Sequence, residues 1–402
     1  MLAALRERDY RVYTLGNMAN QMCMWTLRMT SGWLAWKLTG SATWLGLVGF
    51  ADLAPALIIG PLSGAVVDRV DRLTILRIAQ MIFAALTILL FILVQGGWIT
   101  IELLFGVLLL AGVFLSIAQP ARTSLIPSLV QSQSLHAAIS INSLVSNGGR
   151  LIGPALGGFI IVHWGIGIAF GYCAVSAVVF ATTLWAVRGR PIDYKSKQKR
   201  SIVTDIIEGA SYAAHHRGIG PLMMAMTVTA LLGRSFSTLF PAFVAAVFDR
   251  GADGLAILVA TQGAGALIGG FYLGRRPSVA GLTRVFFINV AVMGCGLIAF
   301  GVSNVFSFAV VVVAGMGTCH LINSAGAQTL VQNAVDENKR GRISGLYGFI
   351  QRGGQAVGAL ALGISGDLIG LRSTVIAAGF LCLVFWLWAL PRSREMEKSL
   401  EN

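Results

Sequence analysis

Charged side chains inside long apolar stretches are the residues of this sequence best suited to chemistry. An ionised group at mid-depth in a bilayer costs roughly 3 kcal/mol or more, so each such charge suggests a function. Two acids lie in these stretches, Asp52 and Glu102, and Glu102 is close to the end of its stretch. Arginines are more numerous, namely Arg28, Arg122, Arg150, Arg234 and Arg352. This excess of guanidinium groups favours recognition of an anion.

Arg28 and Asp52 can be compared by their depth in the bilayer. Each lies about twelve residues from the turn at Gly40 and Ser41, which is about 18 Å along a helix. An ion pair between neighbouring helices is therefore plausible, either as a structural pair or as a proton or substrate site. A buried carboxylate paired with an arginine can be structural or functional. On the functional interpretation, Asp52 is the expected proton-coupling residue.

The other intramembrane polar residues define an expected substrate-binding set. Arg234 has no obvious carboxylate partner, and an unpaired buried arginine should meet a polar network, water or an anionic substrate. Amides and one imidazole add hydrogen-bonding capacity, although His320 can equally be a packing residue. The expected substrate-binding residues are Arg28, Arg234, Asn20, Gln21, His320 and Asn323.

The elements that must position these residues are membrane-spanning helices. Of 402 residues, 56% are hydrophobic and 12% charged, whereas about a quarter of a soluble protein is charged. A helix crosses a bilayer with about 20 apolar residues. Twelve such segments are predicted, at 12–37, 43–67, 74–96, 100–126, 135–162, 166–188, 219–245, 254–275, 281–302, 305–332, 343–366 and 371–391. The fold class is therefore an all-α membrane protein.

Loop charge predicts the orientation of these helices. The net charge is +13, and the basic residues gather in alternate loops and at both termini. We interpret this excess as positive-inside topology rather than nucleic-acid binding, so both termini should be cytoplasmic in a multi-pass inner-membrane protein. The lipid bilayer is then the expected partner, and no nucleic acid is.

The two halves of the chain repeat at an offset of about 205 residues. Three local matches share this offset, at 149–154 and 354–359, at 124–125 and 329–330, and at Arg28 and Arg234. They predict two six-helix bundles in a 6+6 repeat with the substrate site at their interface. The expected domains are an N-terminal bundle at 1–189, a cytoplasmic linker at 190–218, and a C-terminal bundle with a short cytoplasmic tail at 219–402. We expect a monomer.

The linker contains one predicted amphipathic helix. Over residues 201–216, Ile202, Ile206, Ile207 and Ala210 share an apolar face, while Glu208 takes the other. This pattern is typical of a helix that lies on the cytoplasmic membrane surface. A regulatory or partner-binding segment is the alternative.

Three motifs resemble those of the major facilitator superfamily. Gly64, Asp68, Arg69 and Arg72 are similar to its gating motif, with Asp71 where glycine is usual. The fifth segment resembles the exporter and antiporter signature, through Gly149, Arg150, Gly153, Pro154, Gly157 and Gly158. The fourth segment ends in Gln119-Pro120-Ala121-Arg122 and, with the amphipathic linker, resembles the branch of efflux proteins that contains the enterobactin exporter.

The resemblance implies the major facilitator fold, a cytoplasmic gate at Asp68, and alternating access between the two halves. In this superfamily the first, fourth, seventh and tenth helices line the cavity, so Arg28 and Arg234 should face each other across it and clamp an anionic or catecholate-like substrate. The alternatives are a solvated loop cluster for the gating residues and ordinary packing for the glycines, since small-residue faces are common in membrane bundles.

The sequence has no signature of an enzyme. No phosphate-binding Gly-x-x-x-x-Gly-Lys-Ser/Thr run and no metal-ligand spacing occurs in it, so we expect no cofactor and energy from an ion gradient. The predicted function is proton-coupled export of a small organic, siderophore-like anion. The alternatives are multidrug efflux of cationic or neutral compounds, an importer or facilitator of an anionic metabolite, and a membrane scaffold or sensor that does not transport.

Overall fold

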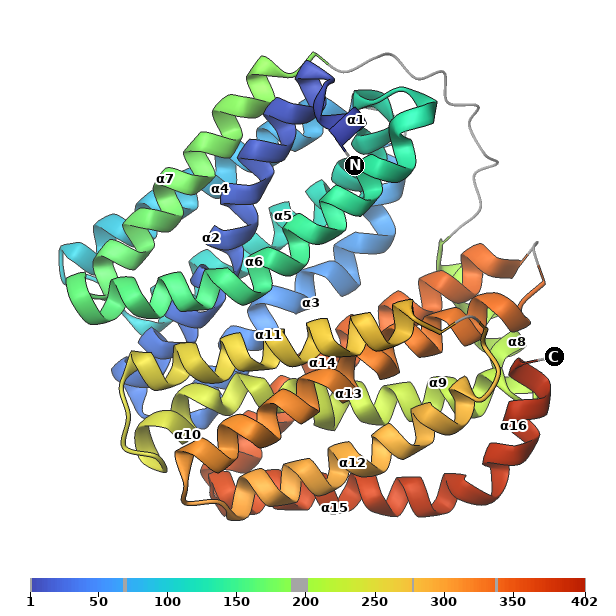
Figure 1. Cartoon of the computed structure of the whole chain (residues 1–402). Coiled ribbons are helices and arrows are strands. Elements are labelled where there is room, and N and C mark those ends of the chain that lie inside the picture. Colours follow the sequence, from blue (N-terminus) through green and yellow to red (C-terminus); the bar gives the residue numbers. More distant parts are fainter. Residues whose placement is uncertain (1, 68–70, 189–201, 277, 337–338, 402) are drawn as a thin grey trace. The chain divides into compact units, whose positions relative to one another are not determined.

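The computed structural model describes residues 2–67, 71–188, 202–276, 278–336 and 339–401. Every regular element in these ranges is helical (Figure 1). Before the linker the helices are α1 Leu2–Leu5, α2 Arg8–Thr39, α3 Ala42–Val67, α4 Arg72–Gln95, α5 Ile101–Leu129, η1 Ser132–Ser134, α6 Leu135–Trp164 and α7 Ile166–Ala186. From the linker on they are α8 Ile202–His215, α9 Ile219–Val228, η2 Thr229–Arg234, η3 Ser235–Leu239, α10 Phe240–Ala246, α11 Ala252–Gly274, α12 Leu282–Val302, α13 Phe306–Ala334, α14 Arg340–Ile369, α15 Leu371–Ala389, η5 Leu390–Arg392 and α16 Ser393–Leu400.

The helix lengths confirm a multi-pass membrane protein. Within the described residues, ten helices are long and apolar enough to cross a membrane. Helices α2 and α14 fall outside that group because they are more polar, yet they contain 32 and 30 residues and so extend about 45 Å or more. With these two helices, the structure is consistent with twelve spans.

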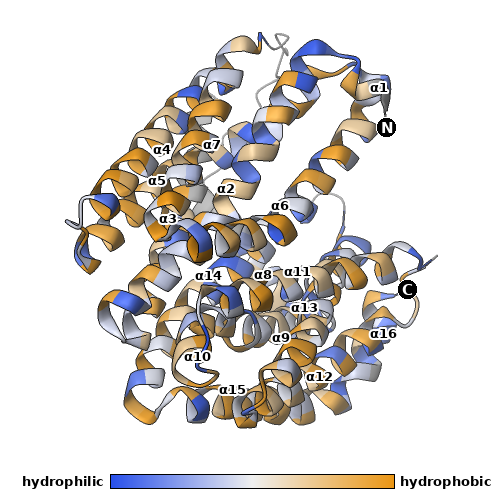
Figure 2. Cartoon of the chain, turned by 60° about the vertical axis from the view of Figure 1, so that its left-hand side comes forward, coloured by the Kyte–Doolittle hydropathy of each residue, from blue (hydrophilic) through white to orange (hydrophobic). Residues whose placement is uncertain are grey.

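Apolar side chains cover the outer faces of the helices. Val175 on α7, Val311 on α13 and Leu368 on α14 are 64%, 69% and 77% exposed, and Figure 2 shows hydrophobic residues along most of the long helices. In water such a surface would be an aggregation liability. Against lipid tails it costs nothing, because the tails are equally apolar.

Contacts divide the chain into two compact units. The first contains residues 1–39, 54–199 and 251–260, and the second contains 40–53, 200–250 and 261–402. Helices α3 and α11 therefore each contribute residues to both units. Two turns recur at the predicted offset, since Gly165 between α6 and α7 has φ +88° and Gly370 between α14 and α15 has φ +89°. Glycine adopts this conformation without strain, so the sequence repeat is also a structural one.

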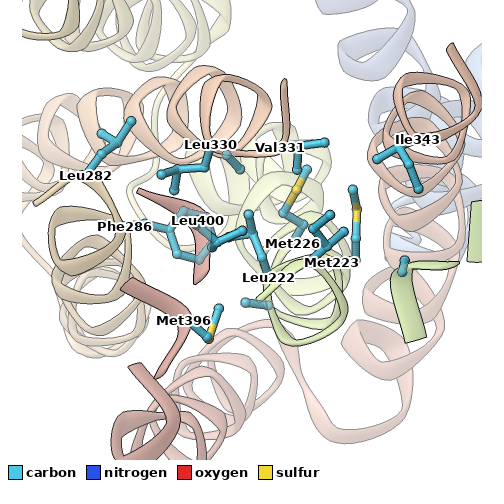
Figure 3. Close-up of a cluster of buried hydrophobic side chains, with 14 of the residues drawn as sticks. Leu222, Met223, Met226, Leu282, Phe286, Leu330, Val331, Ile343, Met396 and Leu400 are labelled. Carbon is cyan, nitrogen blue, oxygen red and sulfur yellow. The ribbon is translucent and has the colours of Figure 1, made fainter. Parts of the chain in front are cut away.

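Each unit has its own buried apolar cluster. In the first unit Tyr10, Phe180 and Leu184 are fully buried, and the Tyr10 hydroxyl donates to the Ala138 carbonyl at 2.7 Å. In the second unit the cluster joins α9, α12, α13, α14 and α16 (Figure 3). Met396 and Leu400 of α16 are fully buried in it. The expected C-terminal tail is therefore a helix that packs against its unit.

The expected linker helix is present, and one of its faces packs against the rest of the second unit. Helix α8 spans Ile202–His215, and Ala213 belongs to the buried cluster while Ala210 is exposed. A Cβ on Gly209 would lie 3.3 Å from the carbonyl oxygen of Arg342, and Glu208 pairs with the same arginine at 2.7 Å. Contact with α14 therefore decides the orientation of this helix.

Candidate functional site

A polar ladder runs along the contact between α2 and α6 in the first unit. The Asn17 amide donates to Asn142 Oδ1 at 3.2 Å, and one turn further the Gln21 amide donates to Ser146 Oγ at 2.9 Å. Both pairs are separated by 125 residues in the chain, so the two helices run in the same direction in register. The spacing of four residues on each helix places these groups on one face.

Glycines let the two helices approach closely enough for this ladder. A Cβ on Gly153 would lie 2.7 Å from the carbonyl oxygen of Met22 and 2.8 Å from Trp25 Cβ. A Cβ on Gly149 or Gly157 would come within about 3 Å of α2 as well. The Thr26 hydroxyl then donates to the Gly153 carbonyl at 2.7 Å. The packing role of these glycines is thus present in the structure, whereas their role in export stays a prediction.

The three arginines of the first unit that the sequence analysis singled out each contact an aromatic ring. The guanidinium carbons of Arg28 and Arg150 lie 5.0 and 4.9 Å from the ring centroid of the same residue, Trp25. Arg122 lies 5.3 Å from the ring of Phe180, and its Nη1 donates to Gln21 Oε1 at 3.4 Å. Cation–π contact partly compensates the cost of placing these cations in a helix bundle.

Arg122 is the arginine with the most unsatisfied donors. Its Nε and Nη2 atoms are buried and have no hydrogen-bond partner among the described residues. The Tyr13 hydroxyl is buried in the same way. Buried polar atoms without a protein partner call for water or a ligand, so this part of α5 and α2 can receive an acceptor group.

Asn20 lies on a different face of α2 from Gln21. It is fully buried, and Gln80 of α4 donates to its Oδ1 at 3.1 Å and to the Ala177 carbonyl at 3.2 Å. These bonds join α2, α4 and α7 inside the first unit. Asn20 therefore has a structural role, and its contact with substrate stays a prediction.

The second unit contains a chain of polar groups around Arg234. Arg234 Nη1 donates to Gln351 Oε1 at 3.5 Å, Gln351 Nε2 donates to the Tyr347 hydroxyl at 3.4 Å, and that hydroxyl donates to the Ser324 carbonyl at 2.7 Å. Arg234 ends the π-helical segment η2, a rare geometry that is frequent at functional sites. The sequence patterns singled out Arg234 but not Tyr347 or Gln351.

The predicted residues on α13 lie close to this chain in sequence. Asn323 precedes Ser324 and is 3% exposed, and both atoms of its amide lack a partner among the described residues. His320 is half-buried one turn earlier on the same helix. An amide that is buried without partners is a ready contact for a polar ligand or water.

The remaining candidates are Asp52 and the residues of the gating motif. Asp52 is half-buried in the part of α3 that belongs to the second unit, whereas Arg28 belongs to the first, so their pairing stays a prediction. Of the gating motif, Gly64 lies within α3, whereas Asp68 and Arg69 lie outside the described residues. Arg72 Nη1 donates to the Ser124 carbonyl at 3.4 Å.

The structure explains why aspartate can replace glycine in that motif. Asp71 is the N-cap of α4, and its carboxylate accepts from the Thr74 amide and the Thr74 hydroxyl, both at 2.9 Å. Aspartate is a favoured N-cap because it satisfies a free amide of the first turn.

The sequence reasoning also missed Asp367 in the last turn of α14. Its carboxylate accepts from the Ser41 hydroxyl at 2.5 Å, the Ala42 amide at 2.7 Å and the Thr43 amide at 2.9 Å. It therefore caps the start of α3, which belongs to the second unit. Burial raises the pKa of Asp367, but the hydrogen bonds from Ser41, Thr43 and Ala42 outweigh it and hold the pKa below its usual value.

Comparison with known proteins relates this arrangement to bacterial transporters. Residues 1–400 match the family described as transmembrane secretion effector. The staphyloferrin A transporter of Staphylococcus aureus is 23% identical over 94% of this chain and 95% of its own length. Macrolide efflux protein A of Streptococcus pyogenes is 24% identical over 90% and 89% of the two chains. The enterobactin exporter of Salmonella choleraesuis is 26% identical over 69% of this chain and 66% of its own.

Solved structures share the fold at lower sequence identity. The crystal structure of the nucleoside transporter NupG superposes with a TM-score of 0.75 at 14% identity, and covers 96% of this chain and 99% of its own. A bacterial homolog of the human lysosomal transporter Spinster gives a TM-score of 0.75 at 15% identity, and covers 99% and 98% of the two chains. The helix arrangement is therefore that of membrane transporters.

Proposed function

Because this chain belongs to the transmembrane secretion effector family of the major facilitator superfamily, we propose that it exports a small organic anion of siderophore-like chemistry. It is a multi-pass membrane transporter with the major facilitator fold. On the proposal it works by alternating access and is driven by a proton gradient. We also propose that it lies in the inner membrane as a monomer, with both termini in the cytoplasm.

The positive charge of the intramembrane arginines is the observation that favours an anionic substrate. Arg122 and Arg234 each donate to a glutamine oxygen, and Arg122 keeps two buried donors without a partner among the described residues. A cation-binding site would instead call for carboxylates. A carboxylate or catecholate oxygen is the acceptor best matched to guanidinium donors, because charge-assisted hydrogen bonds are the stronger ones.

Two relatives support this class by what their names state, since one transports staphyloferrin A and another exports enterobactin. The likeness to a macrolide efflux protein over 90% of this chain favours a second candidate, efflux of a larger neutral or cationic compound. Fold alone does not decide between the two, because one fold serves many substrates.

Transport into inside-out vesicles tests the proposal. Vesicles that contain the protein, made acidic inside, should take up a catecholate siderophore but not a cationic dye, and an uncoupler should abolish uptake. Uptake of the dye alone would favour the second candidate and refute the charge argument. Vesicles in the opposite orientation would show whether the chain imports instead.

Asp52 is the proposed proton carrier. Asp52→Asn should retain binding but lose the dependence of the transport rate on the pH gradient. A variant that keeps the gradient dependence of the natural chain would remove Asp52 from this role. Glu102→Gln is the matched control, because Glu102 is the other acid of the spans predicted from the sequence and lies in the exposed first turn of α5.

A further inference from the structure

Two arginines from different helices of the first unit lie against one indole ring. Arg28 belongs to α2 and Arg150 to α6, and both guanidinium carbons are within 5.0 Å of the ring centroid of Trp25. We infer that these three residues bind the anionic group of the transported molecule, a carboxylate or a catecholate. The inference rests on the proposed function, and it assigns Arg150 and Trp25 to the substrate site in addition to the exporter motif.

The geometry limits the size of the group that can contact both arginines. Since each guanidinium carbon lies at most 5.0 Å from the same point, the two carbons are at most about 10 Å apart. A hydrogen bond of about 2.9 Å and a C–N bond of about 1.3 Å put an acceptor oxygen about 4 Å from a guanidinium carbon. Two neighbouring oxygens of one carboxylate or catecholate, each about 4 Å from one guanidinium carbon, span about the same distance, so the separation is compatible with one ligand held by both arginines.

The charges at this site favour an anion. Arg28 and Arg150 interact with each other electrostatically, and two like charges repel more strongly in a helix bundle than in water. The indole offsets part of this repulsion by cation–π contact. A bound anion would offset more of it through charge-assisted hydrogen bonds. Arg28 is exposed, and Arg150 and Trp25 are half-buried.

The backbone around Trp25 is held in place before any ligand binds. A Cβ on Gly153 would lie 2.8 Å from Trp25 Cβ, and the next residue, Thr26, donates to the Gly153 carbonyl. The register of the polar ladder brings Arg150 to Trp25, because they have the same separation in the chain as Gln21 and Ser146. A site on two packed helices keeps its geometry better than one on loops.

Equilibrium binding to the purified protein in lipid nanodiscs tests this site separately from transport. The probes are 2,3-dihydroxybenzoate, which carries a carboxylate beside a catechol, the uncharged 2,3-dihydroxybenzamide, and ethidium as a cation. The benzoate should bind most tightly. Arg28→Gln and Arg150→Gln should each weaken its binding by about tenfold or more, since each removes a hydrogen bond to a charged group. Arg150→Lys should weaken it less, because it keeps the charge but not the planar fork.

Lys37→Gln is the matched control. Lys37 also lies on α2 over a tryptophan, at 5.9 Å from the ring of Trp33, whereas Trp25 has two arginines against its ring. Its removal should leave binding of the benzoate unchanged. Trp25→Phe, which keeps an aromatic ring, should retain folding and weaken binding less than either loss of arginine.

The outcomes distinguish failure of the binding site from failure of the proposed export function. Equal binding of the benzoate to Arg150→Gln and to the natural chain would overturn the site, as would a natural chain that does not bind the benzoate. Binding that depends on both arginines without uptake in vesicles would support the site and refute the exporter. Siderophore uptake that Arg150→Gln leaves intact would support the exporter and refute the site.

Discussion

Asp367→Asn should loosen the contact between the start of α3 and the end of α14. The carboxylate uses both oxygens, one for the Ala42 amide and the other for the Ser41 hydroxyl and the Thr43 amide. Asparagine has one acceptor oxygen and no charge, so at least one of these bonds and the attraction to the positive helix N-terminus are lost. The glycines nearby show how close the helices are, since a Cβ on Gly363 would lie 2.5 Å from the Ala42 carbonyl oxygen.

The expected magnitude follows from the exposure of the carboxylate. Loss of an N-cap costs about 0.5–2 kcal/mol, and charge at a helix N-terminus contributes about 0.3–1 kcal/mol where it is exposed. Asp367 is exposed, so we take a total of about 1–2 kcal/mol. This corresponds to a shift of about 5- to 30-fold in the equilibrium between packed and separated helices, since about 1.4 kcal/mol is a factor of ten.

Labelling of a buried cysteine measures this equilibrium. Val48 lies in the same stretch of α3 and is 6% exposed, so Val48→Cys should react with a thiol reagent only when the helices separate. The background carries Cys295→Ser, because Cys295 is the exposed cysteine. Asp367→Asn should raise the labelling rate by about 5- to 30-fold, and a rate within twofold of the parent would refute the reasoning.

The pH dependence gives a second check on the same contact. Asp367 follows the expected span 343–366, and its pKa is below its usual value. The stabilisation is therefore present above the unfolded pKa of about 3.9 and is lost only as the pH falls through the lower folded pKa. Labelling of the parent should not change between about pH 5.5 and 8. A rise in labelling within that window would show that another group controls the contact.

Three further substitutions should change stability, each followed by thermal unfolding of the purified protein. Gly153→Ala should cost about 1–3 kcal/mol, because its Cβ meets backbone and Cβ atoms of α2, while Gly148→Ala, with open space around it, should be neutral or stabilising. Leu400→Ala should cost about 2–5 kcal/mol, because this side chain is fully buried in the second unit; an unchanged Tm would mean that α16 does not pack as described. Asp71→Ala should cost about 0.5–2 kcal/mol through loss of the α4 cap, and equal stability of the variant would contradict that role.

The spans were predictable because the bilayer sets their length. The segment expected at 166–188 is α7 at Ile166–Ala186, and that expected at 281–302 is α12 at Leu282–Val302. The seventh segment shows the limit of this method. Hydropathy predicts one span at 219–245, and the structure contains it as Ile219–Ala246, but its backbone passes through α9, η2, η3 and α10. Hydropathy reports burial in lipid and not the hydrogen-bonding pattern of the backbone, which here follows contact with Gly354 and Gly358 of α14.

The sequence identified the intramembrane polar residues but not their hydrogen-bond partners. Asn20 and Gln21 are adjacent in the sequence, so they point about 100° apart on α2. One therefore bonds to Gln80 and the other to Ser146. A spacing of four in both 17, 21 and 142, 146 is a signal that could have identified the α2–α6 ladder. No local pattern marks Asp367, because its partners are 324 or more residues away in the chain.

The two units use the same packing but differ in charge. Gly153 meets the backbone of α2, and its counterpart Gly358 meets the carbonyl oxygen of Leu231 in η2. The repeat has therefore kept the close contact between the first and fifth helices of each half. It has not kept the groups placed there, since Trp25 holds two arginines in the first unit whereas Arg234 donates to Gln351 in the second. On the proposed function, the first unit therefore offers an anion two guanidinium groups against one indole, whereas the second offers one guanidinium group with the Gln351 amide and the Tyr347 hydroxyl.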